Sequence, residues 1–202
     1  MYDFINNNLN AVDWNSLISA VIGGVITGGF SLWAVDKAHK NDLMKEEQQE
    51  KLLIKGFVQS IKTEVQTLWD RYQEGIGNDL EALPQGQPLL AFYPVTQDYF
   101  TIYNGSSFLV GRIKNERLRN AIVKVYTQAR GLIDSYRLNN DLIRELQNLD
   151  SLNTQVGGGV FIPRINAHRQ GLLNYAPVLR ELHQKVKESV ENLLSILKDE
   201  GF

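Results

Sequence analysis

Residues 14–35 constrain the fold of this chain most strongly, because these 22 consecutive residues carry no formal charge and are bounded by Asp13 and Asp36. As an α-helix such a segment extends roughly 33 Å, which exceeds the ~30 Å hydrocarbon core of a bilayer. Trp14 and Trp33 stand 19 positions apart, a spacing that places both indoles at the membrane interfaces, where tryptophan is enriched. The segment predicts a transmembrane helix. A buried helix of a water-soluble protein is the alternative.

Basic residues around this segment predict its orientation. Residues 1–13 contain no Lys or Arg, whereas the stretch after the span contains Lys37, Lys40, Lys45, Lys51 and Lys55. Cytoplasmic flanks carry an excess of basic residues, and interleaved acids count little. We therefore expect a single-pass protein with residues 1–13 outside and the chain after residue 35 in the cytoplasm. Trp14, Trp33, Lys37 and Lys40 are the expected membrane-interface residues.

Small residues recur every four positions inside the expected span. They are Ser16, Ala20, Gly24 and Gly28, and the last two form a GxxxG pattern. Small side chains let two helix backbones approach closely, so packing and weak polar contacts can hold helices together in lipid. This face predicts self-association or pairing with another membrane protein. The alternative is that glycine is simply common in transmembrane helices.

Helical periodicity in the rest of the chain predicts an all-α fold. Residues 36–53 are rich in Glu, Gln and Lys and predict a charged helical stalk. Such a stalk can form a coiled coil with a neighbouring chain. Apolar stripes then predict a first helix up to Gly75–Asn78, a second from about Asn115 to before Thr154 and a third over 163–198. Packed together, these helices predict a cytoplasmic antiparallel helical bundle over residues 54–202.

A Pro- and aromatic-rich crossover, residues 77–114, separates the first two helices of the bundle and is expected to be irregular. Its aromatic residues have two interpretations. A connection that lies across the bundle can bury its rings in the core. Alternatively, the rings form a patch for a ligand or partner, since loops on a rigid scaffold often carry recognition. The candidate patch residues are Tyr93, Tyr99, Phe100 and Tyr103.

The sequence lacks the patterns that carry common chemistries. There is no cysteine, which excludes disulfides and thiolate sites. None of His39, His168 and His183 has metal-ligand spacing, and we expect the last two on helix surfaces. No catalytic residue, metal or cofactor is expected, and we expect no enzyme. A net charge of −2 gives no strong nucleic-acid signal.

The order of these features resembles that of small single-pass membrane proteins of bacteria and their prophages. The similarity covers the Gly-rich span from Ile18 to Ile26, the charged stalk, the segment from Thr96 to Asn104 and the helix containing Ile122–Tyr126. Some members of that group act as membrane effectors in anti-phage defence. The resemblance implies a location in the bacterial inner membrane and an antiviral role.

Two functions are therefore compatible with the sequence. In the first, the chain is a membrane-anchored effector that self-associates through Gly24 and Gly28 and perturbs the inner membrane when triggered. In the second, it is a membrane-tethered adaptor or scaffold whose helical bundle binds a partner protein. The expected partners are membrane lipid and either further copies of the chain or another membrane or cytoplasmic protein.

Overall fold

The computed structural model describes residues 14–95 and 99–202 of the chain, without the side chains of residues 14–30 and 32. Every regular element in this part of the chain is helical, so the expected all-α class is confirmed. The chain divides into two compact units, Met1–Leu53 and Ile54–Phe202. The boundary coincides with the position where the sequence analysis starts the bundle.

Helix α1 spans Trp14–Tyr72 and contributes to both units. In the first unit, the described side chains from Trp33 to Leu53 are exposed. Among the residues open to such a search, no helix has an apolar stretch long enough to cross a bilayer. Most of the expected span, residues 14–30 and 32, lies outside the described side chains.

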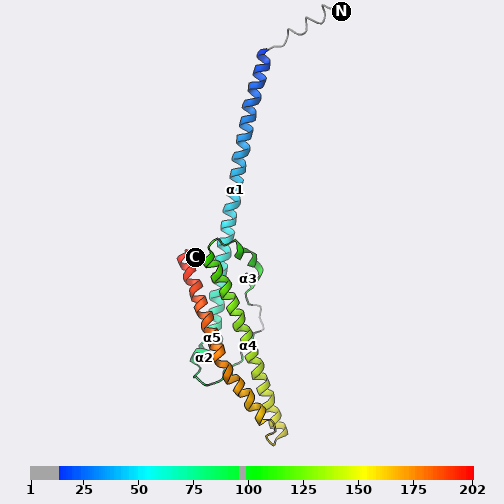
Figure 1. Cartoon of the computed structure of the whole chain (residues 1–202), viewed down its shortest axis with the longest axis vertical. Helices are drawn as coiled ribbons and strands as arrows, with labels where there is room; N and C mark the ends of the chain where they lie inside the picture. Colours follow the sequence, from blue (N-terminus) through cyan, green and yellow to red (C-terminus); the bar gives the residue numbers. More distant parts are fainter. Residues whose placement is uncertain (1–13, 96–98) are drawn as a thin grey trace, which may run out of the picture. The chain divides into compact units, whose positions relative to one another are not determined.

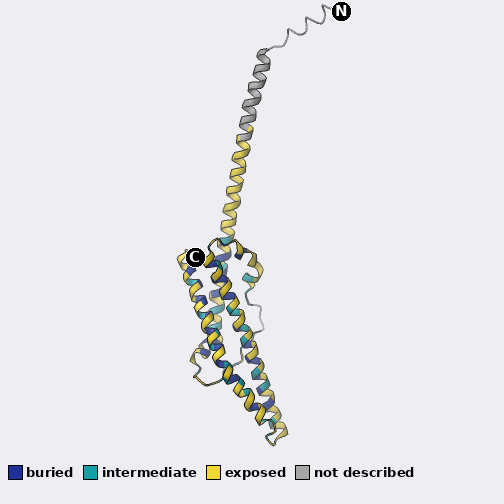
Figure 2. Ribbon diagram, viewed as in Figure 1, coloured by how far each residue is buried: buried dark blue, intermediate teal, exposed yellow. Residues whose placement is uncertain are grey.

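The second unit is built from residues 54–72 of α1 together with α4, Glu116–Val156, and α5, Ile162–Asp199 (Figure 1). Their apolar stripes face one another, as the periodicity predicts, and form one main core (Figure 2). Its fully buried residues include Ile61 of α1, Ile122 of α4, and Leu179 and Leu193 of α5. Burial of apolar surface is the main driving force for this arrangement.

The direction of the three helices differs in part from the expected antiparallel bundle. Glu64 and Tyr72 of α1 contact Tyr126 and Tyr136 of α4 in the same order, so α1 and α4 run parallel. Lys62 contacts Phe202 and Tyr72 contacts His183 in the reverse order, so α5 is antiparallel to α1. The crossover returns the chain to the starting end of the bundle, which makes the parallel pair possible.

The end of α1 also differs from the prediction. Instead of stopping at Gly75–Asn78, the chain continues through a π-helical turn, Gln73–Gly77, into α2, Asn78–Ala82. Gly77 allows this because the side chain of Gln73 folds over it and occupies the place that a Cβ would need. The π-helical turn buries Ile76 and α2 buries Leu80, both in the main core.

The crossover contains more regular structure than the sequence predicts. Besides α2, it includes α3, Thr101–Ser106, and a 3-10 helix η2, Ser107–Arg112. The side chain of Asn115 caps α4, since its Oδ1 accepts a hydrogen bond from the Leu118 N–H at 3.1 Å. At the other end α4 continues to Val156, past the predicted limit. Gly157–Gly159, all with φ near +70°, then form the turn into α5.

Two adjacent asparagines of α4 hold the extended part of the crossover. Asn140 Nδ2 donates to the carbonyl of Tyr93 at 2.6 Å, and its Oδ1 accepts from the N–H of Tyr93 at 3.1 Å. Asn139 Nδ2 donates to the carbonyl of Leu89 at 3.3 Å. Both asparagines are buried. They satisfy backbone groups that a purely apolar helix face would leave unpaired.

Replacing Asn140 with Leu should therefore destabilise the bundle by about 2 kcal/mol, because both polar backbone groups of Tyr93 lose their partner. The measurement is the urea midpoint, read from Trp69 fluorescence in full-length chain with Trp14 and Trp33 replaced by Phe. Asn120→Leu, exposed on the same helix, is the matched control. Equal midpoints for the two variants would show that the Asn140 contacts contribute nothing.

Candidate functional site in the aromatic crossover

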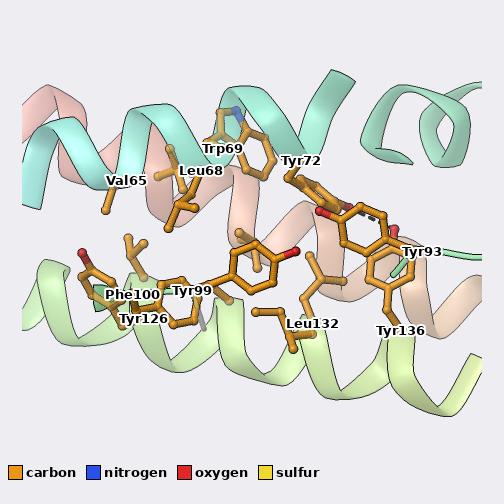
Figure 3. Close-up of a pocket in the computed structure, with 15 residues that line it drawn as sticks. Val65, Leu68, Trp69, Tyr72, Tyr93, Tyr99, Phe100, Tyr126, Leu132 and Tyr136 are labelled. Carbon is orange, nitrogen blue, oxygen red and sulfur yellow. Dashed lines mark hydrogen bonds between the residues drawn. The ribbon is translucent and has the colours of Figure 1, made fainter. Parts of the chain in front are cut away.

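An apolar cavity lies where the crossover meets the bundle. Its volume is about 70 Å³. Figure 3 shows residues of α1 on one side, residues of α4 on the other and rings of the crossover between them. Its lining includes Trp69 and Tyr72 from α1, Tyr99 and Phe100 from the crossover, and Ala129 and Ile133 from α4.

The four aromatic residues predicted as a patch all lie in this region and are half-buried. The Tyr93 ring packs against Tyr136, with 5.2 Å between ring centroids. The Tyr103 ring stacks on Tyr126 at 4.0 Å. Tyr93, Tyr99 and Phe100 line the cavity. These four rings of the crossover thus lie against the bundle, whereas Phe92 and Phe108 are exposed. The ligand or partner role of the four residues stays a prediction.

Among the described residues, Phe100 is the one non-glycine residue with a positive φ; its φ is 76° and its ψ is 40°. This left-handed conformation costs about 1–2 kcal/mol for an L-residue with a side chain. The packing of the ring offsets part of that cost, since Phe100 meets Tyr126 edge-on at 5.2 Å. Strained backbone of this kind is often found at functional sites.

Glu64 of α1 fixes the chain immediately after Phe100. Its carboxylate accepts hydrogen bonds from the Ile102 N–H at 2.8 Å, the Tyr103 N–H at 3.3 Å and the Tyr126 hydroxyl at 2.6 Å. Glu64 is only 8% exposed. A buried carboxylate is tolerated when donors surround it in this way. It holds the start of α3 against the bundle and so determines the position of Phe100.

A second hollow of about 310 Å³ opens beside the cavity, with Tyr99, Phe100 and Ile133 in the wall of both. Its polar residues are Asn104, Arg130, Asp134 and Arg137. The Arg130 guanidinium lies 5.9 Å from the Phe100 ring centroid and 5.8 Å from that of Tyr103. It also donates to Asn104 Oδ1 at 2.5 Å. These contacts orient the Arg130 guanidinium in the wall of the hollow, over the rings of Phe100 and Tyr103.

His183 is the centre of a hydrogen-bonded chain behind the cavity. Its Nε2 lies 2.8 Å from Glu81 Oε1, and its Nδ1 lies 2.8 Å from the Tyr72 hydroxyl oxygen. A carboxylate only accepts, so Nε2 donates to Glu81, while the role of Nδ1 towards the Tyr72 hydroxyl follows the tautomer of the ring. The Tyr136 and Tyr72 hydroxyls are hydrogen-bonded at 3.1 Å, and either of them can be the donor. The prediction that His183 lies on a helix surface is wrong, since it is 4% exposed.

Burial and charge determine the protonation of this chain. Burial raises the pKa of Tyr72 above its ordinary value and that of Tyr136 to about 12, so both hydroxyls stay protonated near neutrality. Hydrogen bonds from Lys187, His183 and Gln73 lower the pKa of Glu81 to about 2. Glu81 is therefore ionised near neutral pH while Tyr72 and Tyr136 are neutral, and these residues form a polar network through His183. It does not supply a phenolate nucleophile.

The membrane-related residues predicted from the sequence belong to the first unit. Trp14 and the association residues Ser16, Ala20, Gly24 and Gly28 are outside the described side chains. Trp33 is exposed, and the Lys37 ammonium lies 5.0 Å from its ring centroid. Lys40 pairs with Asp36 at 2.7 Å, one helical turn away. The structure does not test their interface role.

Sequence reasoning did not identify Glu64, Asn139, Asn140 or His183 as buried polar residues. The signal was present in their spacing. Glu64 follows Ile61 by three positions, Asn139 and Asn140 follow Tyr136 by three and four, and His183 follows Leu179 by four. Each therefore lies on the apolar face of its helix. A polar residue on such a face needs a partner, and here most of the partners belong to the crossover.

Comparisons with protein-family models, with curated proteins and with solved structures find no match to this chain. Within residues 14–95 and 99–202, no three His, Asp or Glu residues are grouped to hold a metal ion. The aromatic crossover, its cavity and the adjoining hollow are therefore the candidate site on geometry alone.

Replacing Glu81 with Gln should remove a pH-dependent part of the stability. The pKa of Glu81 is lowered from 4.5 to about 2 in the folded chain. Its contribution is therefore complete above pH 4.5 and is lost as the pH falls towards 2. Urea midpoints at neutral and acidic pH should show wild type more stable than Glu81→Gln at neutral pH, with a difference that shrinks on acidification. Glu74→Gln, an exposed neighbour, is the control. A difference that does not change with pH would contradict this assignment.

Proposed function

We propose that the chain is a membrane-anchored effector, in which residues 14–35 cross the bacterial inner membrane and self-associate, and the bundle responds to a trigger. The observation that carries this proposal is the coincidence of an uncharged 22-residue segment with a four-residue repeat of small side chains that includes Gly24 and Gly28. The lysines after the segment support a cytoplasmic bundle. The resemblance to bacterial and prophage membrane proteins suggests phage defence as the setting.

A chain element suited to coupling the two units supports the proposal further. Residues 30–55 contain neither Gly nor Pro, and they belong to α1 together with the expected span and with Trp69 and Tyr72 of the cavity. Within residues 30–55 such a helix resists bending better than a Gly- or Pro-rich linker, and Gly56 is the one glycine of α1 between this stretch and Trp69. In this proposal, a trigger sensed by the bundle alters the association of the spans, and the inner membrane then leaks.

Replacing Gly24 and Gly28 together with Leu should abolish depolarisation of cells that express the protein, because Leu side chains keep the helix backbones apart. The measurement is uptake of a membrane-potential dye after induction. Ile22→Leu with Ile26→Leu changes apolar residues with the same spacing, about 200° around the helix from Gly24 and Gly28, and should depolarise like wild type. Membrane fractionation checks that all variants insert. Equal depolarisation by the Gly24/Gly28 variant and wild type would contradict association through this face.

A second candidate function, a membrane-tethered adaptor, is favoured by one feature of the bundle. The turn between α4 and α5 is flanked by exposed apolar side chains, namely Leu152, Val156, Val160 and Ile162. Exposed apolar groups that lie close together often mark contact sites for another protein. In this alternative the span is only a tether.

Exchange of residues 14–35 for an unrelated transmembrane helix separates the two functions. For an adaptor, the growth effect of expression should survive the exchange, while Val156→Asp combined with Val160→Asp should abolish it. For an effector, the exchange itself should abolish the growth effect, since the small-residue face is lost. Growth curves after induction are the measurement.

A further inference from the structure

The cavity and the adjoining hollow differ in chemistry although they share a wall. The cavity of about 70 Å³ is lined by aromatic and aliphatic side chains, including Leu132 and Ala129. The hollow of about 310 Å³ contains two guanidinium groups, those of Arg130 and Arg137. Because Tyr99, Phe100 and Ile133 belong to both linings, the two spaces lie side by side.

The volume of the cavity limits what its apolar part can hold. A dry cavity of about 150 Å³, lined by Leu, Ile and Phe, binds benzene. Roughly half that volume suits an alkyl chain of about three or four carbons better than a ring. Tyr72 and Tyr136 direct their hydroxyls to each other and to His183. The polar atoms of these two lining residues are thus already paired, which leaves an apolar space for a tail.

The charges in the hollow select an anion. Arg130 and Arg137 contribute two positive charges, and Asp134, which pairs with Arg137 at 2.9 Å, contributes one negative charge. A guanidinium carries more N–H groups than these contacts use, so both arginines keep donors for a ligand. Carboxylate and phosphate oxygens match the fork of an arginine. Arg130 is moreover held over Phe100 and Tyr103 before any ligand arrives.

We propose that this compound site binds a small organic oxyanion with a short apolar tail, its head on Arg130 and Arg137 and its tail in the cavity behind Phe100. Phe100 lines both spaces, and the contacts of Glu64 with the following residues hold the chain next to its left-handed backbone. This proposal concerns binding alone and goes beyond the membrane proposal. The membrane proposal does not depend on it.

The test uses the full-length chain in lipid nanodiscs and the probe 4,4,4-trifluorobutanoate, observed by ¹⁹F NMR line broadening. Two matched compounds accompany it, trifluoroacetate, which lacks the tail, and 4,4,4-trifluorobutanol, which lacks the charge. We expect saturable binding of the probe with a dissociation constant in the low millimolar range or tighter. Each matched compound should bind at least about tenfold more weakly. Competition by unlabelled butanoate and by propyl phosphate identifies the preferred oxyanion.

Two variants locate the binding. Arg130→Gln should weaken binding of the probe by about tenfold or more, because the substitution removes the oriented positive charge. Ala129→Leu should weaken it by filling the cavity. Arg117→Gln, exposed on the same helix outside the hollow, should bind as wild type does. Thermal melts confirm that each variant is folded.

Absence of saturable binding by the folded wild type would overturn the proposal. So would equal affinity for the probe in wild type, Arg130→Gln and Ala129→Leu, which indicates adsorption elsewhere. The membrane proposal is judged separately by dye uptake, so depolarisation without probe binding rejects this site alone. Probe binding without depolarisation rejects only the effector function.

Discussion

The architecture of the bundle depends on hydrogen bonds between buried polar side chains and the backbone of the crossover. Glu64 binds the N–H groups of Ile102 and Tyr103, and Asn140 binds both backbone groups of Tyr93. The N–H groups of Ile102 and Tyr103 lie in the first turn of α3 and have no partner within that helix, and the extended segment at Tyr93 has no ladder of its own. Without such partners it would be expelled to water, and the aromatic rings that close the core would leave with it.

The same contacts explain why α1 and α4 can run in parallel. A connection between parallel helices must travel the length of the bundle, and a long loop without structure is rarely kept inside a compact domain. Here the connection is divided into short helices and anchored segments. Arg180 of α5 adds one further anchor, since its guanidinium donates to the carbonyls of Leu83 and Pro84 at 2.6 and 2.8 Å. All three helices thus position the crossover.

The sequence predicted the elements that follow from periodicity, and these agree closely with the structure. The stripes from Ile54 to Tyr72, from Leu118 to Leu149 and from Leu179 to Leu197 lie on the core-facing sides of their helices. Local signals also placed the start of α4 at Asn115. The path of the crossover was not predictable in this way. It depends on pairs such as Asn140 with Tyr93, which are distant in sequence and have no local pattern. The candidate site arises from that path, so only its aromatic residues could be anticipated, and not the cavity or the position of Arg130.

The distance in sequence between α1 and its partner helices has a consequence for synthesis on the ribosome. The apolar face of α1 emerges early, yet its partners in α4 and α5 are distant in sequence, with separations of 62 residues for Glu64 and Tyr126 and 140 for Lys62 and Phe202. At about 5–20 residues per second, several seconds or more pass before α5 is complete. During this interval the nascent chain exposes Phe57, Ile61 and Val65, which are buried in the folded bundle. The newly made protein therefore passes through a period in which chaperones or neighbouring nascent chains compete for the surface that α5 finally covers.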